Sequence, residues 1–332
     1  MSIHIVAPRA GKDYPRNWNE FLDGFASDAA CLAYLQQLRW PAGFVCPNCG
    51  AAGDPYRSSR ARLTCRDCAH QSTVTAGTIF DKTRTPLRVW LAAAWYMTNQ
   101  KQGVSALGLQ RVLGLGSYST AWTMLHRLRR AMVRPDRERL KGVVEIDETY
   151  LALTDRDSPM SDTTRRARKS RTHQVLIVIG VELLKPKGFG RIRLRRIDDD
   201  SADQLIPFVQ DSVEPGSQVR TDGSAAYRDL SALGYAHQRT VMLGSPVPAH
   251  VSMAGVHRVA ALIKRWMLGT HHGSVQPAHL DEYLQEFVFR FNRRTSASRG
   301  MLFYRLLQQA VVTDPVTYRD VVGPLPTRAQ SA

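Results

Sequence analysis

Residues 142–150 alternate between apolar and acidic side chains, which predicts a half-buried β-strand. Val144 and Ile146 fall on one face of such a strand, and Glu145 and Asp147 fall on the other. A strand that holds carboxylates in a basic protein favours a divalent metal, with Asp147 as the first ligand of a phosphoryl-transfer site. An edge strand whose acids face water is the simpler alternative.

The chain beyond this strand predicts an α/β domain. Residues 174–184 are almost wholly Val, Ile and Leu, which indicates a central strand buried on both faces. Residues 191–197 alternate as a third strand, Ser201 caps a helix that ends near Val213, and residues 218–220 form a short fourth strand. The predicted order is therefore three strands, a helix, a strand, a helix and a strand.

Helical spacing dominates the first part of the chain. Residues 18–38 predict a short helical segment, which Asp28 can cap and in which Cys31 is a small buried residue. Thr85 and Pro86 are typical of a helix start, with Thr as the N-cap and Pro at the first helical position.

Two further helices, at 103–113 and 118–132, are separated by a glycine-rich turn at 114–116 and form a candidate helix-turn-helix motif. The face of the last helix opposite its apolar stripe carries basic side chains, which would meet nucleic acid: Arg127, Arg130 and Arg134. An ordinary helical bundle with a solvated charged face is the alternative.

Four of the five cysteines form two C-x-x-C pairs, Cys46 with Cys49 and Cys65 with Cys68. Two such turns complete a tetrahedral zinc site with four sulfur ligands. So small a segment has little core, and the metal would supply most of its folding free energy. A redox dithiol is the alternative.

The chain is strongly basic, with 45 Lys and Arg against 29 Asp and Glu in 332 residues, a formal charge of +16. Such a surplus favours a polyanionic partner, with nucleic acid first. Residues 154–173 predict a flexible basic loop that also binds DNA, through Arg165, Arg166, Arg168 and Lys169. No apolar run approaches a membrane span, so we expect a cytoplasmic protein of the nucleoid with no membrane partner.

Two more residues can complete the metal site. Asp222 ends the fourth strand, where α/β sheets present ligands, although an Asp-Gly turn is the alternative. His257 lies 35 positions later near the start of a helix, and Lys264 follows two helical turns further on. His binds divalent metals, with Mn²⁺ tolerating nitrogen better than Mg²⁺. On composition alone the rival histidines are His237, His250, His271 and His272.

At this point the chain resembles the bacterial insertion-sequence transposases that join an N-terminal zinc ribbon to an ISXO-type catalytic domain, a branch of the Asp-Asp-Glu superfamily. The resemblance spans about residues 39–294 and is carried by these stretches: Arg39-Trp40-Pro41, Cys46-Pro47-x-Cys49-Gly50, Ala76-Gly77-Thr78-Ile79-Phe80, Glu145-Ile146-Asp147-Glu148-Thr149-Tyr150, Thr221-Asp222-Gly223, Val256-His257-Arg258, Lys264-Arg265-Trp266, and Tyr283-Leu284 through Phe291-Asn292-Arg293-Arg294.

The resemblance implies an RNase H-like fold, DNA cleavage with two Mg²⁺ or Mn²⁺ ions about 4 Å apart, and strand transfer at transposon ends. It places the first acid at Asp147, the second at Asp222 and the downstream basic residue at Lys264. The superfamily usually has Glu where this chain has His257. We assign the third metal ligand to His257, with Glu286 as the substitute.

The predicted domains are an N-terminal helical segment (1–38), a zinc ribbon (39–76), a helical DNA-binding region (77–140), an RNase H-like domain (141–300) and a C-terminal helix and tail (301–332). We expect a homodimer or larger assembly on terminal inverted repeats. The alternatives are a non-catalytic zinc-ribbon DNA-binding protein and a different RNase H-like nuclease, such as a resolvase or ribonuclease.

Overall fold

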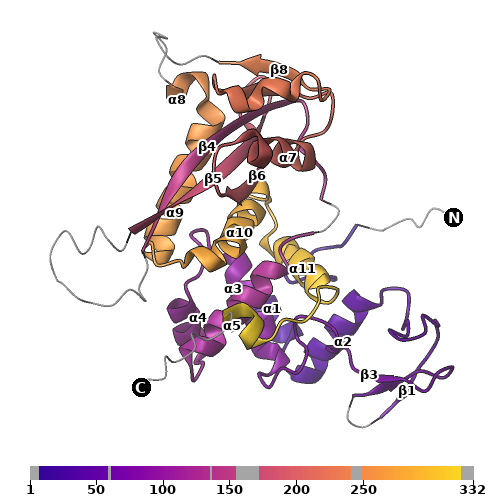
Figure 1. Cartoon of the computed structure of the whole chain (residues 1–332). Helices are drawn as coiled ribbons and strands as arrows, with labels where there is room; N and C mark the ends of the chain where they lie inside the picture. Colours follow the sequence, from indigo (N-terminus) through magenta and orange to yellow (C-terminus); the bar gives the residue numbers. More distant parts are fainter. Residues whose placement is uncertain (1–6, 59–60, 135–136, 155–171, 241–248, 323–332) are drawn as a thin grey trace, which may run out of the picture. The chain divides into compact units, whose positions relative to one another are not determined.

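The computed structural model (Figure 1) describes residues 7–58, 61–134, 137–154, 172–240 and 249–322. The chain forms two compact units. The first, called the helical unit here, contains the chain up to Arg134 and again from Ser296; the second, the sheet unit, contains residues 135–295. The exact domain limits given above stay a prediction. None of the helices in the described ranges is long and apolar enough to cross a membrane.

The sheet unit is built on a five-stranded sheet in the order β6-β5-β4-β7-β8. Its strands are β4 (Val143–Thr154), β5 (Thr172–Leu183), β6 (Phe189–Ile197), β7 (Gln218–Thr221) and β8 (Ala236–Arg239). The first three pair antiparallel, whereas β7 runs parallel to both β4 and β8. The helical elements are α7 (Ala202–Ser212), η1 (Ala225–Leu230), α8 (Ala249–Ser252), α9 (Ala254–His271), η2 (Pro277–His279) and α10 (Leu280–Asn292). The predicted order of elements is confirmed, and the mixed sheet with flanking helices agrees with the expected RNase H-like fold.

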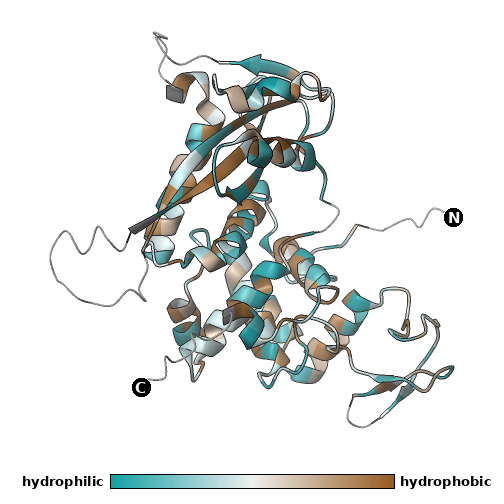
Figure 2. Ribbon diagram, viewed as in Figure 1, coloured by the Kyte–Doolittle hydropathy of each residue, from teal (hydrophilic) through white to brown (hydrophobic). Residues whose placement is uncertain are grey.

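Apolar cores cover both faces of this sheet. On one face, side chains such as Val144, Ile146 and Val178 pack against α7 and η1. On the other face, side chains such as Ile177 and Ile179 pack against α9 and α10. Figure 2 shows β5 coloured as hydrophobic over much of its length, while the outer strand β8 is hydrophilic. β4 is the middle strand, so the alternative of an edge strand with acids facing water is wrong.

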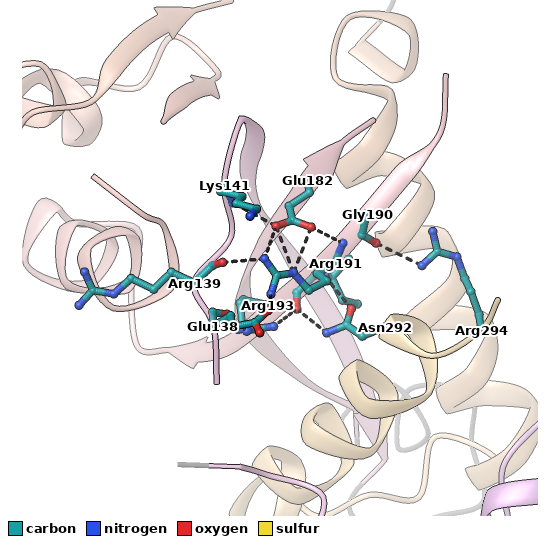
Figure 3. Close-up of polar contacts among 10 residues, drawn as sticks. Glu138, Arg139, Lys141, Glu182, Gly190, Arg191, Arg193, Asn292 and Arg294 are labelled. Carbon is teal, nitrogen blue, oxygen red and sulfur yellow. Dashed lines mark hydrogen bonds and ion pairs between the residues drawn. The ribbon is translucent and has the colours of Figure 1, made fainter. Parts of the chain in front are cut away.

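Side chains from the end of α10 cover the outer edge of β6 (Figure 3). Asn292 accepts from the backbone N–H of Ile192 at 2.7 Å and donates to its carbonyl at 3.2 Å, as a neighbouring strand would. Arg294 donates to the carbonyls of Phe189 and Gly190. An edge strand with open backbone groups invites pairing with another chain. These side chains block the first part of that edge.

An ion-pair network links β5 and β6 beside this cap (Figure 3). Arg191 binds Glu182 at 2.9 Å, and the backbone N–H of Lys141 donates to the same carboxylate at 3.0 Å. Burial opposes ionisation, but these hydrogen bonds outweigh it and lower the pKa of Glu182. A Cβ at Gly190 would lie 2.6 Å from the carboxylate, so only glycine leaves room for this pair.

The helical unit packs aromatic and aliphatic side chains into one core, with Phe21, Leu35, Trp95 and Phe303 among its buried members. Its helices are α1 (Trp18–Gly24), α2 (Asp28–Arg39), α3 (Leu87–Asn99), α4 (Ala106–Leu113), α5 (Tyr118–Arg130), α11 (Arg299–Ala310) and α12 (Tyr318–Val322). A three-stranded ribbon precedes α3, with β1 (Tyr56–Arg57), β2 (Leu63–Thr64) and β3 (Gln71–Ser72).

Two helix-capping predictions are wrong. The segment 18–38 is two helices, and Ser27 caps the second of them by accepting from the N–H of Ala30 at 3.2 Å. Asp28 instead accepts from the N–H of Arg88 at 2.9 Å, so it caps the start of α3. Thr85 has no N-cap role, because α3 begins after Pro86 without a side-chain cap of its own. Cys31 is fully buried, as predicted.

The predicted helix–turn–helix arrangement is present in α4 and α5. Ser105 and Ser117 cap these helices, and Gly114 ends α4 at a φ of 61°, in the left-handed region that favours glycine. The predicted apolar stripe of α5, including Leu125 and Leu128, is buried. The tight four-residue connection from 114 to 117 is typical of such motifs.

Candidate metal centres

The four paired cysteines converge on one point in the ribbon. The Sγ atoms of Cys46 and Cys68 are 3.6 Å apart, those of Cys49 and Cys65 are 3.7 Å apart, and all four lie within 4.8 Å of one another. Zinc–sulfur bonds of about 2.3 Å in a tetrahedron require sulfurs about 3.8 Å apart. The donor set and its spacing therefore fit a structural zinc ion.

The backbone of each C-x-x-C turn explains why the sulfurs point inward. Gly50 donates to the Cys46 carbonyl at 3.0 Å with a φ of 75°, and Ala69 donates to the Cys65 carbonyl at 3.1 Å with a φ of 55°. A left-handed alanine costs about 1–3 kcal/mol. A backbone hydrogen bond from His70, together with the neighbouring sulfurs, lowers the pKa of Cys68 to about 6. Thiolates are the form that binds zinc.

The second candidate centre begins with the pairing of β4 and β7. Their parallel register places Val144 beside Val219 and Glu145 beside Arg220. Asp147 lies two positions after Glu145 in β4. Asp222 lies two positions after Arg220, just past the end of β7. The same register therefore brings these two carboxylates side by side on one face of the sheet.

Electrostatics agree with this placement. Burial is the largest cause that raises the pKa of Asp147, and the nearby carboxylate of Asp222 raises it further. The backbone N–H of Glu148 donates to Asp147 at 2.9 Å and acts in the opposite direction, as does His257. Asp147 therefore lies within electrostatic reach of both other predicted ligands.

His257 occupies the first turn of α9, on the face of the sheet that carries Glu145 and Asp147. Its Nε2 atom is buried and has no hydrogen-bond partner among the described residues. Such an orphaned imidazole nitrogen fits a metal ligand. The rival His237 is accounted for, since its Nε2 lies 2.9 Å from the hydroxyl of Thr221.

Glu145 in β4 forms hydrogen bonds to the start of α9, a role that the sequence analysis missed. Its buried carboxylate accepts from the backbone N–H groups of Gly255 at 2.7 Å and Val256 at 3.3 Å. Arg220 from β7 binds the same carboxylate at 3.3 Å. This contact fixes the turn of α9 that bears His257.

Glu148 points to the opposite face of β4, where the hydroxyl of Tyr227 donates to it. Burial raises the pKa of Glu148 to about 7, and the negative charges of Asp147 and Asp222 contribute. The sequence pattern offered one signal for this residue, its position directly after Asp147, where it breaks the alternation of apolar and acidic residues.

The remaining predicted site residues are placed as follows. Lys264 is exposed on α9 and donates to the hydroxyl of Thr149 in β4 at 2.7 Å. Glu286 is fully buried in α10, where its carboxylate binds Arg290 at 2.7 Å. Within the described ranges, the ligand atoms of Asp147, Asp222 and His257 are not all within 4.8 Å of one another, so this centre is wider than the cysteine site.

The predicted DNA-contacting arginines in α5 and just after it differ in exposure. Arg130 and Arg134 are exposed, whereas Arg127 is half-buried and donates to the carbonyl of Ile79 at 3.2 Å. Arg127 is thus partly held inside the fold, and contact of all three arginines with nucleic acid stays a prediction. The basic-loop residues Arg165, Arg166, Arg168 and Lys169 lie outside the described residues.

Comparison with known proteins gives two family matches. A model described as a transposase zinc-ribbon domain matches residues 26–71, and one described as an ISXO2-like transposase domain matches residues 139–292. An uncharacterized protein in the transposable element ISH50 of Halobacterium salinarum is 27% identical over 277 residues, which cover 80% of this chain and 91% of that protein. That relative is archaeal, so it does not support the expected bacterial host.

Proposed function

Because this chain is an ISXO2-like transposase of the IS1595 type, with a zinc ribbon and a DDE transposase domain, we propose that it cleaves and joins DNA at the ends of its own insertion sequence. The observation that carries this proposal is the parallel register of β4 and β7, which sets Asp147 next to Asp222, together with the electrostatic influence of Asp222 and His257 on Asp147. The match of residues 26–71 to a transposase zinc-ribbon domain, with its four clustered cysteines, supports DNA binding by the N-terminal half.

In this proposal Asp147, Asp222 and His257 hold divalent ions, Mg²⁺ or Mn²⁺. The buried Nε2 of His257 has no hydrogen-bond partner among the described residues, and a bound cation would give it one. A cation would also reduce the repulsion between the carboxylates of Asp147 and Asp222. When bound, the ions supply activation of a water or a DNA 3′-hydroxyl and stabilisation of the leaving oxygen. The ion pair between Glu286 and Arg290 supports His257 over Glu286 as the third ligand.

The chain's own residues position the DNA around the metal ligands. Lys264 is exposed beside β4 and would contact a phosphate next to the scissile bond. Glu145 holds the turn that carries His257. The mechanism needs no covalent bond between protein and DNA.

DNA recognition is assigned to the zinc ribbon, to α4 and α5 with Arg127, Arg130 and Arg134, and to the basic residues Arg165, Arg166, Arg168 and Lys169. Two ends must be joined in one reaction, so the working form is a homodimer or larger assembly. The strong positive charge of +16 supports a polyanionic partner.

The test is Asp222→Asn, which keeps the size of the side chain and removes the charge that holds a cation. We expect metal-dependent cleavage of a duplex from the DNA flanking the coding sequence to fall by a factor of about 1,000 or more, while binding of that duplex persists. Asp229→Asn is the matched control, because Asp229 is an exposed aspartate of η1.

Cleavage by Asp222→Asn at the wild-type rate would show that the site is misassigned. Binding without cleavage by the wild-type protein, in Mg²⁺ and in Mn²⁺, would favour the alternative of a non-catalytic DNA-binding protein.

A further inference from the structure

A hollow of about 340 Å³ lies in the helical unit, between the segment 82–85 and the first turns of α5, and Trp90, Met124 and Tyr318 form the apolar part of its wall. Basic side chains form part of its wall, and hydroxyl groups form much of the rest. Its main polar lining residues are Lys82, Arg84, Arg127, Ser119, Thr120 and Thr123. No Asp or Glu is among the residues that line it.

The basic side chains of this lining suit a phosphate group better than a cation. Lys82 and Arg84 are exposed at the rim, so they can reach a large ligand that does not enter fully. Ammonium and guanidinium groups form charge-assisted hydrogen bonds to phosphate oxygens. The hydroxyls of Thr123 and Ser119 already bond within α5 and its cap, so the charged groups would supply the main contacts. A carboxylate in the wall would repel that ligand; the lining has none, and the negative charges of Asp81 and Asp320 act on Arg127 from outside it.

Arg127 is built into the wall rather than left in solvent. One nitrogen of its guanidinium donates to the carbonyl of Ile79 at 3.2 Å, which fixes the side chain. Its Nε atom is buried and has no hydrogen-bond partner among the described residues. The charge is thus held in place before any ligand arrives, which reduces the entropy lost on binding.

The position of the hollow on the motif identifies the ligand. The second helix of a helix-turn-helix enters the major groove with its N-terminal residues, and flanking groups bind the DNA backbone. The first residues of α5 are exposed: Tyr118, Ser119 and Thr120. Ser117 already accepts from the N–H of Thr120 at 3.1 Å, so side chains and not that backbone group are available for the ligand.

We propose that this hollow binds a phosphate of duplex DNA through Lys82 and Arg84, and thereby sets the first turn of α5 in the major groove. The inference rests on the proposed function only in requiring that the chain binds DNA. It adds a backbone contact from the segment that precedes α3, which the sequence analysis did not include among the DNA-binding residues.

The test is the double variant Lys82→Gln with Arg84→Gln in the full chain, with zinc bound and divalent ions omitted so that no cleavage occurs. Lys101→Gln with Arg305→Gln is the matched control, because it removes one Lys and one Arg that are exposed in the same unit and do not line the hollow. Circular dichroism and zinc content confirm that both variants are folded.

Two duplexes serve as probes, one from the DNA flanking the coding sequence and one of scrambled sequence and equal length. We expect the Lys82/Arg84 variant to lose about tenfold or more in affinity for both duplexes. The slope of log affinity against log salt concentration should fall by about 1–2. The control variant should change each value much less.

Equal losses in the two variants, or an unchanged Lys82/Arg84 variant, would overturn the inference. A loss confined to the flanking duplex would also overturn it, since a phosphate contact is independent of sequence. If the wild-type protein binds neither duplex, the proposed function fails instead.

A second measurement does not depend on the variant alone. Duplexes with one phosphate at a time replaced by a neutral methylphosphonate should reveal a position that weakens wild-type binding but leaves the Lys82/Arg84 variant unaffected. The absence of any such position would contradict the proposed contact.

Discussion

At the residue scale, the contact between Glu145 and α9 decides where His257 stands. The carboxylate lies 2.7 Å from the N–H of Gly255 and is almost fully buried. A Cβ at Gly255 would come within 2.7 Å of the same oxygen, so the close approach needs glycine. Glu145 touches no DNA in our proposal and is a positioning residue.

Glu145→Gln should therefore impair the metal centre without unfolding the sheet unit. One of the two carboxylate oxygens becomes an amide nitrogen, so either the N–H groups of α9 or the guanidinium of Arg220 lose a buried acceptor, and the charge that holds Arg220 is removed. We expect Mn²⁺ affinity or cleavage to fall about 10- to 100-fold. Titration calorimetry with Mn²⁺ measures this directly, and hydrogen exchange should speed up at Gly255 and Val256.

The exposed Glu214→Gln is the matched control and should leave both measurements unchanged. A Glu145→Gln protein that binds Mn²⁺ like the wild type, with protected α9 amides, would show that this contact does not position His257.

The sequence predicted which acids meet but not what holds them. The order of strands predicted that the strands of Asp147 and Asp222 are neighbours, and the structure supplies the register that pairs them. The bonds of Glu145 to Gly255 and of Asp28 to Arg88 join residues 110 and 60 positions apart. No local pattern encodes such contacts, and the local rule assigned Asp28 to the wrong helix.

At the element scale, the zinc ribbon is the part of the chain that most needs its metal. Its strands have only two residues each. Few of its apolar side chains are buried, with Phe44 and Leu63 among them. Such a small core provides little stability without a bound metal or a disulfide. The cysteines that hold the metal therefore decide the fold of this element, and their spacing was enough to predict it.

Removal of zinc by a strong chelator should unfold the ribbon and leave the helices intact. We expect fast hydrogen exchange at the backbone amides of Cys65 and Ala69, which are otherwise bonded across the second turn. The helical circular dichroism signal should change little. Unchanged exchange in metal-free protein would show that the ribbon folds without zinc.

The sequence predicted the helices of the helix-turn-helix correctly, but not the contacts of the charged side chains on their surface. Helical periodicity located the buried stripe of α5, since that stripe depends only on spacing. It did not reveal that Arg127 turns toward Ile79, because that contact comes from a segment 48 positions earlier. Spacing predicts which face is apolar, but not which charged side chains bond within the fold.

At the scale of the whole molecule, the chain leaves the helical unit, forms the sheet unit and returns. α11 packs in the helical unit, with Phe303 and Leu307 fully buried. Its nearest sequence neighbour is α10 of the other unit, so position along the chain gave no sign of this return. A division of the sequence into consecutive domains cannot describe a unit that contains both the N-terminal and the C-terminal part of the chain.

The convergence of Asp147, Asp222 and His257 on one metal centre is tested most directly by mapping where a bound metal sits. Fe²⁺ substituted for Mg²⁺, with peroxide and a reductant, generates radicals that cut the polypeptide close to the ion. We predict cuts in β4 near Asp147, after β7 near Asp222 and in the first turn of α9, all suppressed by excess Mg²⁺. Cuts in the cysteine ribbon would not respond to Mg²⁺. Mg²⁺-sensitive cuts around Glu286 in α10 in place of α9, or none after β7, would contradict the proposed centre.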